Sequence, residues 1–122
     1  MLDPHWTYAV LGANNNQDKY GYIVCKDLLD AWYHIIPINP YENNVLWLLC
    51  YPTLSDYQGT IDMVIFVVQP TITEKVLPEV HKLGIKKVRL QPWSESPASI
   101  AFCEKNNISY IHNACIMIQK NI

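Results

Sequence analysis

Short apolar runs alternate along this chain with longer segments in which apolar residues recur at helical spacing. The runs are rich in β-branched and aromatic residues, which is typical of buried strands. We expect strands at residues 6–11, 33–38, 61–68, 87–90 and 108–111. The helical spacing predicts helices from Lys19 to about Ala31, from Thr71 to Gly84, and over residues 97–106. Strands that alternate with helices form βαβ units with right-handed crossovers, so the sequence predicts an α/β fold with a mostly parallel sheet.

Two segments carry further local signals. We expect Thr71 to be the N-cap of its helix, because Glu74 lies three residues on and completes a capping box. Residues 41–56 are the least regular part of the chain. Pro52 and the pair Asn43-Asn44 favour a loop with a short turn of helix there.

Composition limits the classes of function. The 122 residues are half hydrophobic and 16% charged, which suits a single domain, residues 1–122, whose sheet is covered on both faces. The formal net charge of −2 gives no reason to expect nucleic acid or an anionic membrane as partner. The longest apolar stretch, residues 63–68, is too short to span a bilayer. With four cysteines, no CxxC pair and no signal-peptide pattern, we expect a cytoplasmic protein with reduced thiols.

The turns that follow the expected strands are polar or contain proline. In a parallel sheet, ligands bind in the crevice beyond the carboxyl ends of the strands, where the strand order reverses. The residues expected at those ends are Gly12-Ala13-Asn14, Asn39-Pro40, Gln69-Pro70 and Gln91-Pro92. We therefore expect a small ligand to bind at this edge of the sheet.

Gly12, the polar loop after it and the helix near Lys19 form a candidate phosphate cradle. Backbone N–H groups at a helix N-terminus lack intrahelical partners and attract anions, and Lys19 adds a positive charge. Neither a GxGxxG nor a GxxxxGK[ST] motif is present. Asn39-Pro40 stands where an acidic residue would hold the ribose of a nicotinamide dinucleotide, which disfavours NAD. On spacing alone, phosphate binding and a purely structural turn are equally good interpretations.

Seven short motifs, taken in order, extend over nearly the whole chain. They comprise residues 10–14, 19–21, 37–40, 51–56, 62–64, 90–92 and 114–117. In these motifs the sequence resembles the small stand-alone CoA-binding proteins, which are similar in fold to the CoA-binding domain of succinyl-CoA ligase alpha subunits. The resemblance implies a three-layer Rossmann-like fold, with about five strands in a mostly parallel sheet and helices on both faces. It also implies coenzyme A as the ligand.

The resemblance further implies roles for single residues. Those that would approach the diphosphate or close over it are Gly12, Ala13, Asn14, Lys19 and Tyr20. Asn39 and Pro40 would flank the adenosine. Those that would line the path of the pantetheine arm are Val68, Pro70, Gln91 and Pro92. For each residue alone a structural role is an equally good interpretation, but as a set they favour a ligand.

Four residues depart from the pattern of these CoA-binding proteins. Trp32, Trp47 and Trp93 stand where glycine is typical, and Arg89, the sole arginine, stands where tryptophan is typical. A bulky residue adopts a positive φ only at a cost, and an arginine in a strand needs a partner or solvent. Three explanations are open. The first is natural divergence, with the tryptophan rings packed over the CoA pocket. The second is deliberate engineering of an aromatic binding surface. The third is translation with the wrong codon table, for a source organism that reads one of the codons as glycine and another as tryptophan.

His112 and Cys115 are close in sequence and raise the alternatives of a metal site or a nucleophile with its base. Zinc needs about four ligands and no second pair is near, so we expect no metal. We expect Cys115 to be structural, the alternative being a thiol close to that of CoA that forms a mixed disulfide with it. The acidic residues form no convincing acid/base pair, and no serine lies in a nucleophile elbow.

We therefore expect non-catalytic binding of coenzyme A or an acyl-CoA, by a chain that is not itself an enzyme. Two other functions stay open: an accessory subunit or fragment of an acyl-CoA synthetase or ligase, and an NAD(P)-binding domain. Self-association and an unidentified protein partner are both open as well. Exposure of Trp32 or Trp47 would favour association.

Overall fold

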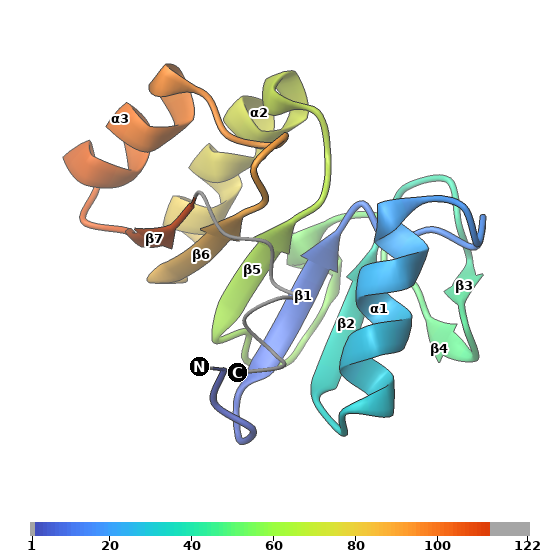
Figure 1. The fold of residues 1–122 in the computed structure, drawn as a ribbon. Coiled ribbons are helices and arrows are strands. Elements are labelled where there is room, and N and C mark those ends of the chain that lie inside the picture. Colours follow the sequence, from blue (N-terminus) through green and yellow to red (C-terminus); the bar gives the residue numbers. More distant parts are fainter. Residues whose placement is uncertain (1, 113–122) are drawn as a thin grey trace.

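The computed structural model describes residues 2–112, and over these residues its main sheet has five parallel strands. Their order is β2-β1-β5-β6-β7 (Figure 1). They are β1 (Thr7–Leu11), β2 (His34–Ile38), β5 (Met63–Phe66), β6 (Lys87–Leu90) and β7 (Ser109–Ile111). The chain runs outward from β1 to β2 and then returns to the other side of β1 at β5. The strand order therefore reverses between β1 and β5.

Helices cover both faces of this sheet. Helix α1 (Tyr20–Asp30) packs over β1 and β2, whereas α2 (Pro70–Lys82) and α3 (Pro97–Lys105) lie side by side on the other face (Figure 1). Successive side chains of a strand point to opposite faces, so Val10 joins the hydrophobic cluster under α1 and Ala9 joins the cluster under α2 and α3. The three-layer α/β arrangement with a mostly parallel sheet is thus confirmed.

The three helices end in the same motif. Two backbone N–H groups beyond each helix donate to carbonyls of its last turn, as the Tyr33 N–H does to the Leu28 carbonyl (2.9 Å). The residue just past each end has a positive φ, and these residues are Trp32 (+69°), Gly84 (+75°) and Asn107 (+57°). Glycine adopts this conformation freely and asparagine tolerates it. Because Trp32 has a positive φ, it occupies a backbone position suited to glycine. Its side chain is 90% exposed.

Residues 41–56 are more regular than the sequence suggests. They contain an antiparallel hairpin, β3 (Asn44–Val45) with β4 (Leu48–Leu49), and a short 3-10 helix, η1 (Leu54–Asp56). The expected turn of helix is confirmed, but the sequence does not predict the hairpin, because strands of two residues are too short to show a periodicity. Tyr51 bridges to Ile38, so this segment extends the sheet beyond β2.

The start of α2 corrects one expectation. The prediction that Thr71 is the N-cap, with Glu74 completing a capping box, is wrong, because Gln69 is the N-cap and Pro70 lies in the first turn. Proline is favoured at the first helical position, where an N–H would have no intrahelical partner. The Glu74 carboxylate instead accepts a hydrogen bond from the Ser96 hydroxyl (2.7 Å), which joins α2 to the start of α3.

The strand expected at residues 61–68 is shorter than its apolar run. Before it, the Asp62 N–H donates to the Thr7 carbonyl (2.9 Å), but the Thr7 N–H donates to the Asp62 carboxylate (2.8 Å) and not to a backbone carbonyl. After it, the Val68 N–H donates to the Ser94 hydroxyl (3.0 Å) and not to a neighbouring strand. Side chains therefore take over part of the backbone hydrogen bonding at both ends of β5.

Candidate functional site

The loop after β1 lies directly against the start of α1. Gly12 has a φ of +97°, and a Cβ atom there would overlap the Val67 carbonyl oxygen. A Cβ on Gly21 would likewise overlap the Gly12 carbonyl oxygen, so the backbones of loop and helix are in contact. The positive φ and the close approach both require glycine. They place the first backbone amides of α1 beside the loop of Gly12, Ala13 and Asn14.

The ends of β1 and β2 are joined by hydrogen bonds. The Gly12 N–H donates to the Ile38 carbonyl (3.0 Å), and the Asn39 side-chain amide donates to the Ala13 carbonyl (2.7 Å). The Asn14 side chain accepts from the Asn16 N–H (2.7 Å), which closes the loop on itself. The predicted residues Gly12, Ala13, Asn14 and Asn39 therefore lie together, and Pro40 follows them, exposed, at the same edge.

The N-terminus of α1 offers its amides to a ligand. Lys19 is the N-cap in extended conformation, and among the described residues no side chain caps this end. The first turn also contains no acidic residue. Uncapped amides and the helix dipole together favour an anion at such a position. The exposed Lys19 side chain adds a positive charge at the same place.

The other predicted residues lie at the carboxyl ends of β5 and β6. Val68 and Pro70 are half-buried, Gln91 is fully buried and Pro92 is exposed. The rings of Tyr20 and Trp93 stack with their centroids 4.5 Å apart and their planes tilted by 36°. Tyr20 begins α1 and Trp93 follows β6, so this pair connects the loops on either side of β5. All the predicted site residues within the described chain thus belong to one edge of the sheet.

The remaining departures from the CoA-binding pattern lie away from this edge or inside the fold. Trp47 is exposed in the turn of the β3–β4 hairpin. Arg89 is only 1% exposed and pairs in register with Ile65 and Ile111 in the neighbouring strands. Burial raises the pKa of Tyr8 to about 12, and the positive charge of Arg89 opposes this slightly. Nothing described here explains why an arginine stands at position 89.

The described thiols are poor nucleophiles. Burial raises the pKa of Cys25 to about 12 and that of Cys103 to about 11, and it also raises the pKa of Cys50. At neutral pH these groups are protonated, whereas a reactive cysteine requires a thiolate. Cys115, the predicted thiol site, lies outside the described residues. His112 contacts the Glu95 carboxylate through Nδ1 (3.1 Å).

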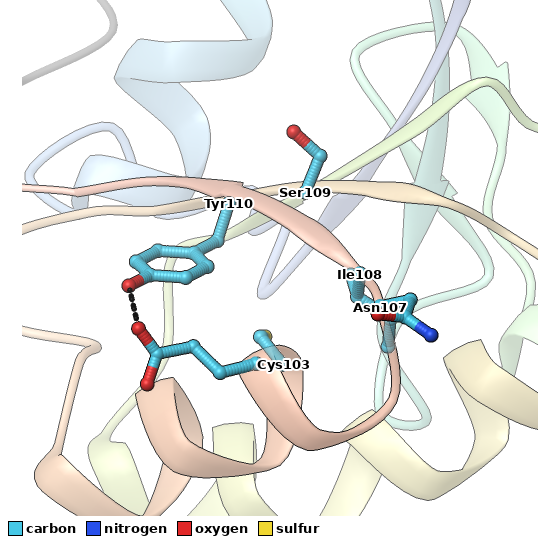
Figure 2. A pocket seen from close by; sticks show the side chains of 6 residues that line it. Cys103, Asn107, Ile108, Ser109 and Tyr110 are labelled. Carbon is cyan, nitrogen blue, oxygen red and sulfur yellow. Dashed lines mark hydrogen bonds between the residues drawn. The ribbon is translucent and has the colours of Figure 1, made fainter.

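A shallow depression between α3 and β7 offers no alternative site. It is lined by Cys103, Glu104 and residues 107–110, none of which was expected to bind a ligand (Figure 2). The Tyr110 hydroxyl donates to the Glu104 carboxylate (2.8 Å), and this bond raises the pKa of Tyr110. The hydroxyl and the carboxylate therefore form a hydrogen bond with each other at the edge of the depression.

The described residues contain neither a cluster of metal ligands nor a helix suited to a membrane. Within residues 2–112, no three His, Cys, Asp or Glu side chains gather closely enough to hold a metal ion. Over the same residues, no helix has the length and apolar character needed to cross a membrane.

A family comparison fits this geometry. The sequence matches the CoA binding domain family over residues 6–121. The chain belongs to this family. The family assignment confirms the resemblance drawn from the seven motifs and the expected ligand class, coenzyme A.

Curated relatives place this CoA binding domain within longer proteins. The ADP-forming acetate–CoA ligase of Methanocaldococcus jannaschii is 36% identical over 78 residues, which are 64% of this chain and 11% of that protein. The alpha subunit of ADP-forming acetate–CoA ligase II of Pyrococcus furiosus is 32% identical over 81 residues, 66% of this chain and 18% of that protein. The chain thus spans less than a fifth of the length of these relatives.

Solved structures include small proteins of nearly the same extent. A conserved hypothetical protein from Pyrococcus furiosus superposes with a TM-score of 0.90 at 34% identity, covering 93% of this chain and 98% of that one. The dinucleotide-forming acetyl-coenzyme A synthetase 1 of Ca. Korarchaeum cryptofilum superposes with a TM-score of 0.76 at 20% identity. That match covers 88% of this chain and 25% of the synthetase, and it shows a shared fold.

Two residues at this edge were not expected from the sequence. Glu42 accepts a hydrogen bond from the Asn15 N–H (2.9 Å) through its carboxylate, so it contacts the loop after β1. Its signal is its position four residues beyond Ile38, just past the point where an acidic residue is expected in a dinucleotide site. Ser94 is buried and binds the Val68 N–H, and its position two residues past Pro92 gives no comparable signal.

Proposed function

We propose that this CoA binding domain holds coenzyme A at the carboxyl edge of its sheet, with the diphosphate over the loop of Gly12, Ala13 and Asn14. One observation carries the proposal: this loop is in backbone contact with the uncapped N-terminus of α1. Backbone amides and the helix dipole at such a junction are suited to a diphosphate. Lys19 supplies a positive side chain beside it.

The other predicted residues fit the remaining parts of the ligand. Asn39 and Pro40 follow β2 and flank the adenosine, because the Asn39 amide holds the end of β2 against the phosphate loop. The pantetheine arm passes the ends of β5 and β6, along Val68, Pro70, Gln91 and Pro92. Tyr20 and Trp93 close over this path through their ring stack. The ligand therefore crosses the point at which the strand order reverses.

The domain performs no chemistry of its own in this proposal. The described thiols have raised pKa values, which leaves them protonated at neutral pH. Most residues at the edge are glycine, amides, prolines and aromatic rings, and of its charged residues Lys19 and Glu42 are not paired with each other in any hydrogen bond described. Coenzyme A or an acyl-CoA would be held for storage, sensing or presentation to another protein.

Calorimetric titration with CoA, NAD and ATP tests this proposal. We expect CoA to bind, and Lys19→Ala to weaken its binding roughly fivefold, as expected for the loss of one favourable charge of about 1 kcal/mol. Lys105→Ala, an exposed lysine at the far end of α3, is the matched control and leaves the affinity unchanged. Binding of NAD without CoA, or equal losses in the two variants, would refute the proposal.

A second candidate is supported by the relatives: the domain serves as the CoA-holding part of an acyl-CoA ligase. The matched proteins are ADP-forming acetate–CoA ligases, of which this chain spans a small part. Incubation with CoA, acetate and ATP separates the candidates. The chain alone forms no ADP in either case, but a ligase component restores ADP formation when an ATP-binding partner subunit is added. A gene neighbour that encodes such a partner would favour this candidate, and no restoration would favour the first.

A further inference from the structure

We propose that His112, positioned by Glu95, accepts the thiol proton of bound coenzyme A and so prepares the ligand to take up an acyl group. This inference rests on the proposed function, since it assumes that the pantetheine arm passes the ends of β5 and β6. It deepens that function, because it names the reacting group of the ligand, the thiol, and a base for it.

His112 follows the last strand of the sheet, at the same edge as the proposed ligand. Strand β7 runs parallel to β6, and Ile111 pairs in register with Arg89, so His112 comes level with the last residue of β6 (Figure 1). Neighbouring strands lie about 4.8 Å apart, which puts the end of β7 roughly 10 Å beyond that of β5. A pantetheine arm that passes β5 and then β6 therefore continues toward His112.

The loop after β6 connects the end of β5 to this histidine. The Ser94 hydroxyl accepts a hydrogen bond from the Val68 N–H (3.0 Å), which fixes the loop against the end of β5. The next residue along the chain, Glu95, contacts Nδ1 of His112 through its carboxylate (3.1 Å). One short loop thus holds both Val68, on the proposed path of the arm, and the imidazole at the end of β7.

The contact with Glu95 sets the tautomer of His112. An ionised carboxylate only accepts hydrogen bonds, so Nδ1 carries the proton and Nε2 of the neutral ring keeps a lone pair that can accept one. The ring also lies beside that of Tyr110, with their centroids 5.4 Å apart. The side chains of His112 and Glu95 are 32% and 23% exposed, so a ligand can reach the pair. A histidine oriented in this way through Nδ1 is suited to act as a general base through Nε2.

The proposed step is a single proton transfer. An alkyl thiol is mostly protonated at neutral pH, whereas the thiolate is the nucleophile. The S–H bond of CoA breaks, the proton passes to Nε2 of His112, and the electron pair stays on sulfur. The Glu95 carboxylate stabilises the imidazolium that forms. The thiolate then attacks an acyl donor that another protein supplies: a C–S bond forms, and the leaving group of the donor departs with the electrons of the bond that breaks.

Alkylation of bound CoA by iodoacetamide measures this activation directly. The thiolate sulfur displaces iodide from the reagent, and mass spectrometry follows the alkylated CoA, so that the cysteines of the protein do not contribute to the signal. We expect CoA bound to an excess of the unaltered chain at neutral pH to react at least roughly tenfold faster than free CoA, a modest factor for a general base.

Three variants assign the effect to the pair. We expect His112→Gln to lose the acceleration, and Glu95→Gln to lose most of it, because an amide can donate to Nδ1 and so move the ring proton to Nε2. His81→Gln is the matched control, since this exposed histidine lies in the last turn of α2 at the opposite edge of the sheet, and it keeps the acceleration. Calorimetry checks that each variant still binds CoA, and circular dichroism checks that it is folded.

The outcomes separate this inference from the proposed function. If bound CoA reacts no faster than free CoA, or equally fast on the unaltered chain and on His112→Gln, the role of His112 is wrong and CoA binding stands. If His112→Gln weakens CoA binding while bound CoA keeps its reactivity, the pair is only structural and the inference fails as well. If CoA does not bind, the proposed function fails and this inference fails with it. The comparison of bound with free CoA on the unaltered chain decides the matter even where a variant does not fold.

Discussion

Helices α1 and α3 pack on the same sheet and end in the same motif, but they begin differently and carry different residues at the position of positive φ. Helix α3 starts with a Ser96 side chain that accepts from the Ser99 N–H (3.1 Å), and it ends beside Asn107 in the left-handed conformation. Helix α1 starts at Lys19 without a side-chain cap and ends beside Trp32. Helix α3 thus has a side-chain cap at its start and, past its end, a residue that tolerates a positive φ. Helix α1 has neither and so violates both preferences. Such violations are expected where a protein binds something, and the uncapped start of α1 lies at the proposed phosphate site.

The contact that holds the start of α1 is expected to show the largest effect. In Gly21→Ala, the new methyl overlaps the Gly12 carbonyl oxygen, so helix and loop must separate. We expect a loss of about 3 kcal/mol in the free energy of unfolding, measured by denaturant titration. Gly84→Ala is the control, because Gly84 has a positive φ but open space around it, and it costs about 1 kcal/mol. Equal costs would show that the overlap is relieved cheaply.

A cap introduced at α1 makes its start resemble that of α3. In Lys19→Asp, the new carboxylate accepts from amides of the first turn and competes with the diphosphate for them. We expect stability to rise by about 0.5 kcal/mol while the affinity for CoA falls at least roughly tenfold. Lys19→Ala measures the loss of the lysine charge separately. An unchanged affinity in Lys19→Asp would mean that the ligand does not use this helix end.

Removal of the cap at α3 is the converse change. Ser96→Ala loses the bond to the Ser99 N–H and the bond to Glu74 (2.7 Å). We expect thermal or chemical unfolding to show a loss of about 1 kcal/mol, with CoA affinity unchanged. A large loss of affinity at unaltered stability would place α3, and not α1, at the ligand.

The smallest effect is expected at the other end of α1. In Trp32→Gly, the strain of a bulky residue at φ +69° is removed, and the greater freedom of glycine in the unfolded chain offsets part of the gain. We expect the free energy of unfolding to rise by about 0.5 kcal/mol. Asn107→Gly changes stability less, because asparagine tolerates this conformation. A loss of stability in Trp32→Gly would indicate that the exposed ring makes a contact that favours tryptophan.

The sequence predicts the layers of this fold better than its details. Runs such as residues 6–11 and 33–38 are long enough to show their strand character, and their order dictates a parallel sheet. The β3–β4 hairpin is too short for a periodic signal, and Pro70 outweighs the apparent capping box of Thr71 and Glu74. Local patterns therefore indicate long elements, whereas short ones depend on contacts between distant residues.

The candidate site shows the same division. The turn residues after each strand could be predicted because topology alone brings strand ends to one edge. Their contacts could not, since the bond from Asn39 to the Ala13 carbonyl and that from the Asn15 N–H to Glu42 join residues 26 and 27 positions apart. Glu42 in particular gains its significance from the loop that it touches and not from a motif.

The stacked rings of Tyr20 and Trp93 give the carboxyl edge of the sheet an optical reporter of its own. Tyrosine transfers excitation energy to a tryptophan at such short range, and indole emission shifts when its exposure to water changes. A ligand that parts these rings alters the fluorescence of Trp93, while the exposed Trp32 and Trp47 and the partly buried Trp6 contribute a constant background. Ligand binding at this edge can thus be followed in the unlabelled protein.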